Sequence, residues 1–185
     1  VLTFYPDGTS WVSAFSEQSE QIEFDAANNE WVFTTDNDSI ERYNTNGKLL
    51  SIETRSGQTT MLSYVSGELD SVTDSAGRSI SFAYDTNGNL ASMTDPAGSV
   101  YEFSFDTSGR LIEIVFPDDT PGTSSDNPTR GYHYEDTSFP HSVTGITDEN
   151  SSRYSTYEYD YQGRAISSAL TGAYSRDVAY GGTYS

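Results

Sequence analysis

Residues 84–98 read Tyr-Asp-Thr-Asn-Gly-Asn-Leu-Ala-Ser-Met-Thr-Asp-Pro-Ala-Gly, and this stretch decides the fold. An aromatic residue and an aspartate precede a turn centred on Gly88. An apolar residue, a short strand-like run and a second turn follow. Asx side chains bond the backbone of a tight turn, and glycine supplies its left-handed position. Each copy of this phrase therefore predicts two turns and two strands, which make a β-hairpin.

The phrase recurs along the chain at a nearly constant spacing. The distance is 21 residues from Tyr43 to Tyr64, 20 from Tyr64 to Tyr84, and 21 from Tyr84 to Phe105. A fixed period of this length is typical of repeat architectures, in which one unit cannot bury its own apolar face and neighbouring units must pack together. The residues that we expect to shape the turns and the aromatic stripe beside them are Tyr43, Gly47, Tyr84, Asp85, Gly88, Phe105, Asp106, Gly109, Arg110, Tyr159, Asp160, Gly163 and Arg164.

Aromatic and polar residues alternate between the turns. A period of two places one set on each face of a sheet, and no run of ten or more residues shows the 3.6-residue period of a helix. The sequence therefore predicts an all-β fold with almost no helix: a strip of antiparallel hairpins with one aromatic and one polar face. The aromatic face should carry Ile80, Phe82, Tyr84, Tyr101, Phe103, Phe105, Tyr157, Tyr159 and Tyr161.

The later motifs carry a family resemblance. They are His133–Asp136, Phe139–His141, Val143–Asn150 and Tyr159–Ala165, in this order. With the repeated Tyr-Asp turns, they closely resemble the YD repeats of bacterial Rhs proteins, which are related to toxin-complex C subunits and teneurins. The resemblance covers nearly the whole chain. It implies that residues 1–185 are a single YD-repeat segment of a longer chain, wound as part of a hollow shell that encloses a C-terminal toxin.

One stretch interrupts the period. Phe105 and Tyr134 are 29 residues apart, and the excess lies in residues 117–131, which are rich in Pro, Ser, Asp and Thr. Such a composition is typical of an exposed connection. We therefore expect an inserted surface loop at residues 117–131.

The charge balance excludes some partners. The chain has 28 Asp and Glu against 9 Lys and Arg, a formal net charge of -19. Nucleic acids and anionic membrane surfaces both require clustered basic residues, so neither is an expected partner. The chain has no cysteine, which excludes zinc–cysteine sites and disulfides, and no apolar run is long enough to span a membrane as a helix.

Candidate chemical sites are few. His133 and His141 are the only histidines, and a zinc site would need acidic residues to complete it. Residues 36–41 faintly resemble a calcium loop but lack its glycine and its terminal glutamate. The Rhs family also has a self-cleaving aspartyl site, whose motif residues 95–99 do not match. We therefore predict no catalytic residue, no metal and no cofactor.

Two repeated features have more than one interpretation. Arg78, Arg110 and Arg164 could pair with turn aspartates of neighbouring units, and an exposed pair of this kind stabilises by at most about 1 kcal/mol. The aromatic stripe could stack sugars, but it could equally form the core between paired hairpins, and we favour the core.

The sequence favours a non-enzymatic, structural role: a segment of a bacterial, extracellular or cell-surface shell that shields an effector during export. Its partners would be further repeats and the C-terminal effector of the same polypeptide. An extracellular module that binds a carbohydrate or a protein is the alternative, and a glycoside hydrolase is a third. Open sheet edges also predict self-association.

Overall fold

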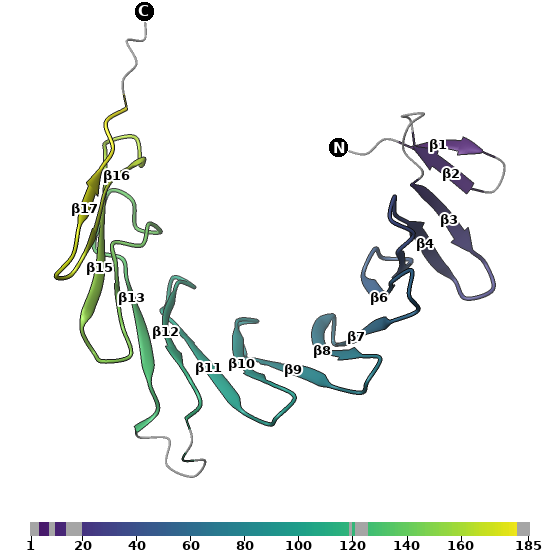
Figure 1. Cartoon of the computed structure of the whole chain (residues 1–185), viewed down its shortest axis with the longest axis horizontal. Coiled ribbons are helices and arrows are strands. Elements are labelled where there is room, and N and C mark those ends of the chain that lie inside the picture. The colour runs from purple at the N-terminus through teal and green to yellow at the C-terminus, as the bar shows by residue number, and fades with distance from the viewer. Residues whose placement is uncertain (1–3, 8–9, 14–19, 119, 121–125, 181–185) are drawn as a thin grey trace, which may run out of the picture. The chain divides into compact units, whose positions relative to one another are not determined.

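The computed structural model describes residues 4–7, 10–13, 20–118, 120 and 126–180. These residues form strands joined by tight turns, with no α-helix among them, which confirms the predicted all-β hairpin fold (Figure 1). No helix that could cross a membrane occurs in this described part. The strands are β1 (Phe4–Asp7), β2 (Ser10–Ser13), β3 (Gln21–Asp25), β4 (Glu30–Thr34), β5 (Ile40–Asn44), β6 (Leu49–Glu53), β7 (Thr59–Val65), β8 (Glu68–Asp74), β9 (Ser79–Tyr84), β10 (Leu90–Thr94), β11 (Val100–Phe105), β12 (Leu111–Val115), β13 (Thr129–His133), β14 (Gly145–Thr147), β15 (Arg153–Tyr159), β16 (Ala165–Leu170) and β17 (Ser175–Asp177).

The chain divides into two compact units. Unit 1 comprises residues 1–82 and 95–97, and unit 2 comprises residues 83–94 and 98–185. In unit 1, consecutive strands from β1 to β9 pair antiparallel. In unit 2, β10 to β17 do the same. Each unit is thus a meander of hairpins, the arrangement that the repeated turns predict.

Each unit has two edges at which the chain reverses. We call the edge with the Tyr-Asp turns the motif edge and the other the return edge. Glycines with positive φ lie at both, as the turn chemistry requires: Gly88 has φ 82° at the motif edge, and Gly77 has φ 81° at the return edge. Where glycine is replaced, Asp38 and Ser151 adopt the same left-handed conformation, with φ 62° and 59°.

The two edges differ in their strand register. At the motif edge the pairing shifts beside the aromatic residue: Tyr43 pairs with Leu49 while Arg42 pairs with Ser51, so one residue bulges. The same shift occurs beside Tyr64, Phe105 and Tyr159. The pairs around the return turns that follow β6, β8 and β10 run without a shift, but the pairing shifts between Ile146 and Thr147, beside the return turn that joins β14 to β15. A bulge increases the local twist, so each shifted pairing twists its two strands more strongly.

Side chains alternate between the two faces as predicted. In β11, Tyr101, Phe103 and Phe105 are half-buried, and the residues between them are exposed. In β9, Ile80, Phe82 and Tyr84 are half-buried, while Ser81 and Ala83 are exposed. In β3 and β4, Phe24 and Trp31 pair across the strands and their ring centres lie 5.1 Å apart.

The sheet has almost no conventional core. Among the residues whose exposure is described, Val32 is the only buried apolar side chain, at 7% exposure. The aromatic stripe is half-buried, so each ring is covered on its flanks by the neighbouring hairpin and stays partly open. Stability must therefore come from contacts between adjacent strands, as in other repeat arrays.

Two sequence expectations need correction. Thr129–Gly131, assigned above to the end of the inserted loop, form the start of β13 because they pair with β12. Part of the loop, residues 119 and 121–125, lies outside the described residues. Tyr161 does not join the aromatic face, since it lies in a turn after β15 and is 86% exposed.

The Gly47 turn provides a test of backbone strain. Gly47 has φ 79°, and a Cβ atom there would meet nothing within 4 Å, so a side chain costs only conformational energy. We expect Gly47→Ala to lower the free energy of unfolding by about 1 kcal/mol, because an L-residue is strained in this conformation. Gly47→Asn should cost less, since asparagine tolerates it better. Urea unfolding followed by circular dichroism measures both, and equal losses would contradict this account.

Candidate functional site

The motif-edge turns share one hydrogen-bond pattern. In the Asp85 turn, the Asp85 N–H donates to the Asn89 carbonyl at 2.9 Å, and the Gly88 N–H donates to the Asp85 carbonyl at 3.1 Å. The Asp85 carboxylate accepts the N–H groups of Asn87 and Asn89 at 2.8 and 2.9 Å. The side chain thus satisfies donors that the tight turn leaves open. The same pattern holds at Asp106, Asp160 and, with an amide oxygen, Asn44.

Arginine adds a second contact within two of these turns. Arg110 Nε and Nη2 both lie 2.6 Å from Asp106 Oδ2. Arg164 holds Asp160 Oδ2 in the same way, at 2.7 and 2.6 Å. The hydrogen bonds of the arginine side chain and backbone N–H lower the pKa of both carboxyl groups, so these aspartates stay charged.

The arginine pairing corrects a sequence expectation. Arg78, Arg110 and Arg164 pair with the aspartate of their own turn, four residues earlier, and not with that of a neighbouring unit. The five-residue turn brings its first and last residues together, so the carboxylate nearest to each arginine is that of its own turn.

The contact to the next hairpin is made by a tyrosine. Tyr64 Oη donates to the Leu49 carbonyl at 2.8 Å, and Tyr134 Oη donates to the Leu111 carbonyl at 3.0 Å. Tyr180 Oη donates to the Ala165 carbonyl at 2.9 Å. In each case the acceptor directly follows the motif-edge turn of the preceding hairpin. The phenol therefore satisfies a carbonyl beside the bulge.

The cation of that preceding turn lies over the same tyrosine ring. Lys48 Nζ lies 4.9 Å from the Tyr64 ring centre, and Lys48 also donates to the Gly67 carbonyl. The Arg110 guanidinium lies 4.8 Å from the Tyr134 ring centre, and that of Arg164 lies 4.3 Å from Tyr180. We call this combination of a turn cation on the ring and a tyrosine hydroxyl on the carbonyl the repeat latch.

A longer connection replaces the motif-edge turn between β13 and β14. Residues 135–143 dock on both neighbouring turns: Arg110 donates to the Pro140 carbonyl, and the Phe139 ring lies against Gly163. A Cβ atom on Gly163 would come within 3.0 Å of that ring. This connection joins the turns of two hairpins. Arg110 contacts Asp106, Tyr134 and Pro140 at the same time.

A polar cluster joins this connection to β15: Glu135 and Thr144 lie between β13 and β14, and Arg153 begins β15. Arg153 Nη1 and Nη2 lie 3.1 and 2.9 Å from the two Glu135 carboxylate oxygens. The Thr144 hydroxyl donates to Glu135 at 3.0 Å, and Arg153 also donates to the Thr144 and Ser155 carbonyls. Hydrogen bonds from Arg153 and then Thr144 lower the pKa of Glu135 to about 2.

Glycine makes room for this arginine. A Cβ atom on Gly145 would lie 2.1 Å from Arg153 Nη2, so the guanidinium occupies the space that any side chain would need. Gly131, on the adjacent strand β13, faces its nearest atom at an ordinary 3.5 Å. No sequence motif indicates this cluster, because Glu135 lies 9 positions from Thr144 and 18 from Arg153.

A depression of about 400 Å³ lies next to the cluster. Its lining combines three carboxylates with two aromatic rings, two threonines and one aliphatic side chain. The lining residues are Glu135, Asp136, Thr144, Thr156, Tyr157, Glu158, Tyr159 and Ile166.

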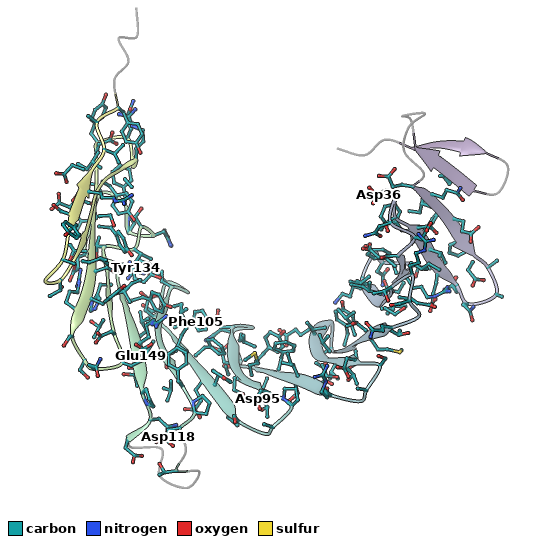
Figure 2. All side chains as sticks on the ribbon, in the orientation of Figure 1. Asp36, Asp95, Phe105, Asp118, Tyr134 and Glu149 are labelled. Carbon is teal, nitrogen blue, oxygen red and sulfur yellow. The ribbon has the colours of Figure 1, made fainter. Side chains whose placement is uncertain are left out.

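The other candidate residues lie in ordinary turn or strand positions. His133 lies in β13 with Nε2 2.7 Å from Thr147 Oγ1, and His141 is exposed. Residues 35–39 form a return turn in unit 1, where Asp36 is labelled in Figure 2. Asp38 in that turn pairs with Arg55 at 3.3 Å. Among the described residues, no group of three His, Asp or Glu side chains could hold a metal ion.

Three predicted aromatic residues end strands at the motif edge. Tyr84 ends β9 and is half-buried. Tyr43 lies near the end of β5 and donates to Glu41 at 2.5 Å; burial and this acid raise its pKa to about 12. Tyr159 ends β15 and donates to the Val143 carbonyl at 2.7 Å. Tyr64 follows Leu49 and Tyr180 follows Ala165 by 15 positions, but Tyr84 follows Leu69 by the same interval and the latched Tyr134 follows Leu111 by 23, so spacing alone does not identify the latch.

Comparison with known families gives a match that agrees with this geometry. The RHS repeat model matches residues 65–100 and 84–121. Residues 65–121 carry RHS repeats. These residues include the turns at Asp85 and Asp106, so the resemblance drawn from the Tyr-Asp motifs is confirmed. No curated protein matches the chain in sequence.

Solved structures with the same fold come from Tc toxins. A Photorhabdus luminescens Tc holotoxin pore matches at a TM-score of 0.53 and 16% identity, over 86% of this chain and 9% of that one. TcdB2–TccC3–TEV matches at 0.54 and 17%, over 89% and 10%. TcdB2–TccC3 without its hypervariable C-terminal region matches at 0.51 and 17%, over 85% and 9%. At this identity the likeness concerns the fold, and this chain spans about a tenth of each.

The latch at Arg110 predicts unequal effects of two arginine substitutions. Tyr134→Phe should lower the free energy of unfolding by about 1 kcal/mol, because the Leu111 carbonyl loses its donor. Arg110→Ala should cost more, since Asp106, Tyr134 and Pro140 all lose a contact. Arg78→Ala is the matched control: its side chain is 73% exposed, and its ion pair should contribute little. Equal urea midpoints for Arg110→Ala and Arg78→Ala would rule out the latch.

The Glu135–Arg153 pair predicts an acid-dependent loss of stability. The folded-state pKa of Glu135 is lowered from 4.5 to about 2, so its contribution is complete above pH 4.5 and disappears as the pH falls toward 2. Glu135→Gln should therefore destabilise the protein at pH 7 and match wild type near pH 2. Urea unfolding across this range measures the difference, and a difference independent of pH would contradict the assignment.

Gly145→Ala should reproduce that pH dependence without altering an ionisable group. The new methyl group displaces the Arg153 guanidinium, so Glu135 loses its main partner. Gly131→Ala is the matched control on β13, where the added methyl makes only an ordinary contact.

Proposed function

We propose that this chain is a non-catalytic wall segment of an Rhs-type shell, which encloses and shields a C-terminal toxin or effector of the same polypeptide for export from a bacterium. The observation that carries the proposal is the repeat latch, which joins neighbouring hairpins through side chains at one edge at three junctions, β6–β7, β12–β13 and β16–β17. Such a device suits a long wall, because it works at any number of repeats.

The comparisons support this role by their fold. The similar structures belong to Tc toxins, and one of them is defined by the removal of a hypervariable C-terminal region. The RHS repeats at residues 65–121 connect this chain to the same architecture. Val32 is the one buried apolar side chain among the residues whose exposure is described, so further repeats of the same polypeptide are natural neighbours of the meander. An extracellular or cell-surface location follows from this role.

The test is protection of the region that follows the repeats. In the full-length polypeptide, limited proteolysis should leave that region intact while the wall is folded. Arg110→Ala combined with Arg164→Ala breaks two latches and should expose it to cleavage, whereas Arg78→Ala should not. Cleavage of the wild-type region as fast as that of the same region expressed alone would refute the proposal.

The depression beside Tyr157 and Tyr159 favours a second candidate function, the binding of a carbohydrate. Its aromatic rings, carboxylates and hydroxyl groups are the combination that sugars contact. Glu158→Ala and Tyr157→Ala should then reduce binding to an immobilised glycan array. Equal signals for these variants and wild type would exclude this candidate.

A further inference from the structure

The junctions between hairpins at the motif edge can be aligned through the strand register. The pairs Ser51 with Met61, Ser92 with Glu102, Glu113 with Gly131, and Ser167 with Asp177 occupy equivalent places. In each case the first residue lies two positions after the apolar residue that follows the turn. The second lies three positions before the aromatic residue of the next hairpin. The four aromatic residues Tyr64, Phe105, Tyr134 and Tyr180 are therefore structurally equivalent.

Three of these four junctions carry the complete repeat latch; β8–β9 has the same register, through Ser71 and Ser81, but has Glu68 at the position of the cation and no latch. Lys48 with Tyr64, Arg110 with Tyr134, and Arg164 with Tyr180 each combine a cation over the ring with a hydroxyl hydrogen bond to the preceding carbonyl. The latch is maintained even where the connection between the hairpins is longer, since the β12–β13 connection precedes Tyr134. Its recurrence shows that the contact depends on register and not on loop length.

The junction between β10 and β11 differs at both positions. Asn89 stands where the latched turns have a cation, and Phe105 stands where the latched hairpins have tyrosine. The Asn89 side chain donates to Asp85 Oδ2 at 3.1 Å, so it completes its own turn but brings no charge to the next ring. Phe105 has no hydroxyl to offer the Leu90 carbonyl. Figure 2 labels Phe105 and the latched Tyr134, both in unit 2.

The turn itself is unchanged at this junction. The Asp85 carboxylate accepts both backbone N–H groups, Gly88 has φ 82°, and β10 pairs with β11 in the usual register. The substitutions therefore remove the two latch interactions and leave the hairpin intact. In a single-layer sheet without a core, the strength of a junction depends directly on such edge contacts.

We propose that the β10–β11 junction is a built-in weak point of the repeat strip: its strands separate before those of the latched interior junctions β6–β7 and β12–β13. The inference concerns the repeats alone and does not rest on the proposed function. In a wall made of these repeats, it identifies a junction at which adjoining hairpins part more readily than at a latched one.

Hydrogen exchange of the chain, resolved to single amides, tests the proposal. A cation–π contact and a net hydrogen bond together correspond to roughly tenfold in an opening equilibrium. The interstrand amides of β10 and β11 should therefore exchange roughly tenfold faster than those of β6–β7 and β12–β13. Equal protection at the three junctions would overturn the proposal.

A gain-of-latch variant provides the stronger test. Asn89→Arg with Phe105→Tyr introduces both missing groups at equivalent positions and should slow exchange at β10–β11 roughly tenfold. Each single substitution should have a smaller effect, because each supplies only one of the two interactions. An unchanged rate in the double variant would overturn the proposal.

The reverse variant tests the same proposal if the gain-of-latch variant does not fold. Arg110→Asn with Tyr134→Phe copies the β10–β11 residues onto β12–β13 and should raise exchange there to the β10–β11 level. The β6–β7 junction, which keeps Lys48 and Tyr64, is the internal control and should not change. Retention of the wild-type protection at β12–β13 would overturn the proposal.

Discussion

The structure depends on one constraint: a single layer of antiparallel strands has no second layer against which to bury its apolar face. Only Val32 is a buried apolar side chain among the residues whose exposure is described. The aromatic residues can be covered only by the hairpins beside them, so the junctions between hairpins carry the stability that a core supplies elsewhere. The repeat latch is the side-chain device that meets this need at the motif edge.

The latch combines several tasks in few residues. Asp106 caps its turn through one carboxylate oxygen and holds Arg110 through the other. The aspartate thus fixes the guanidinium in the position from which it lies over Tyr134. Because the arginine is already ordered within its own turn, contact with the next hairpin costs less side-chain entropy. A turn signal that is local in sequence thereby becomes a contact between repeats.

Sequence reasoning predicted the features that depend on neighbours along the chain. The turn at Asp85 and the alternation through Phe105 follow from spacing and residue type alone, and both lie where they were expected. The sequence predictions were wrong where pairing with another strand determines the structure. Thr129–Gly131 have a loop-like composition but pair with β12, and Tyr161 follows the alternating pattern but lies in a turn. The Glu135–Arg153 pair joins residues 18 positions apart and leaves no local pattern.

By itself, the sequence determined the hairpin, its period and the two faces of the sheet, because backbone turn chemistry and side-chain alternation act over a few residues. The tertiary structure decided which partner each side chain takes. Arg110 was expected to reach an aspartate of another hairpin, and instead it pairs with Asp106 and lies over Tyr134. The physical reason is that strand register, including the bulges beside Tyr43, Tyr64, Phe105 and Tyr159, sets which groups from different hairpins come within contact distance.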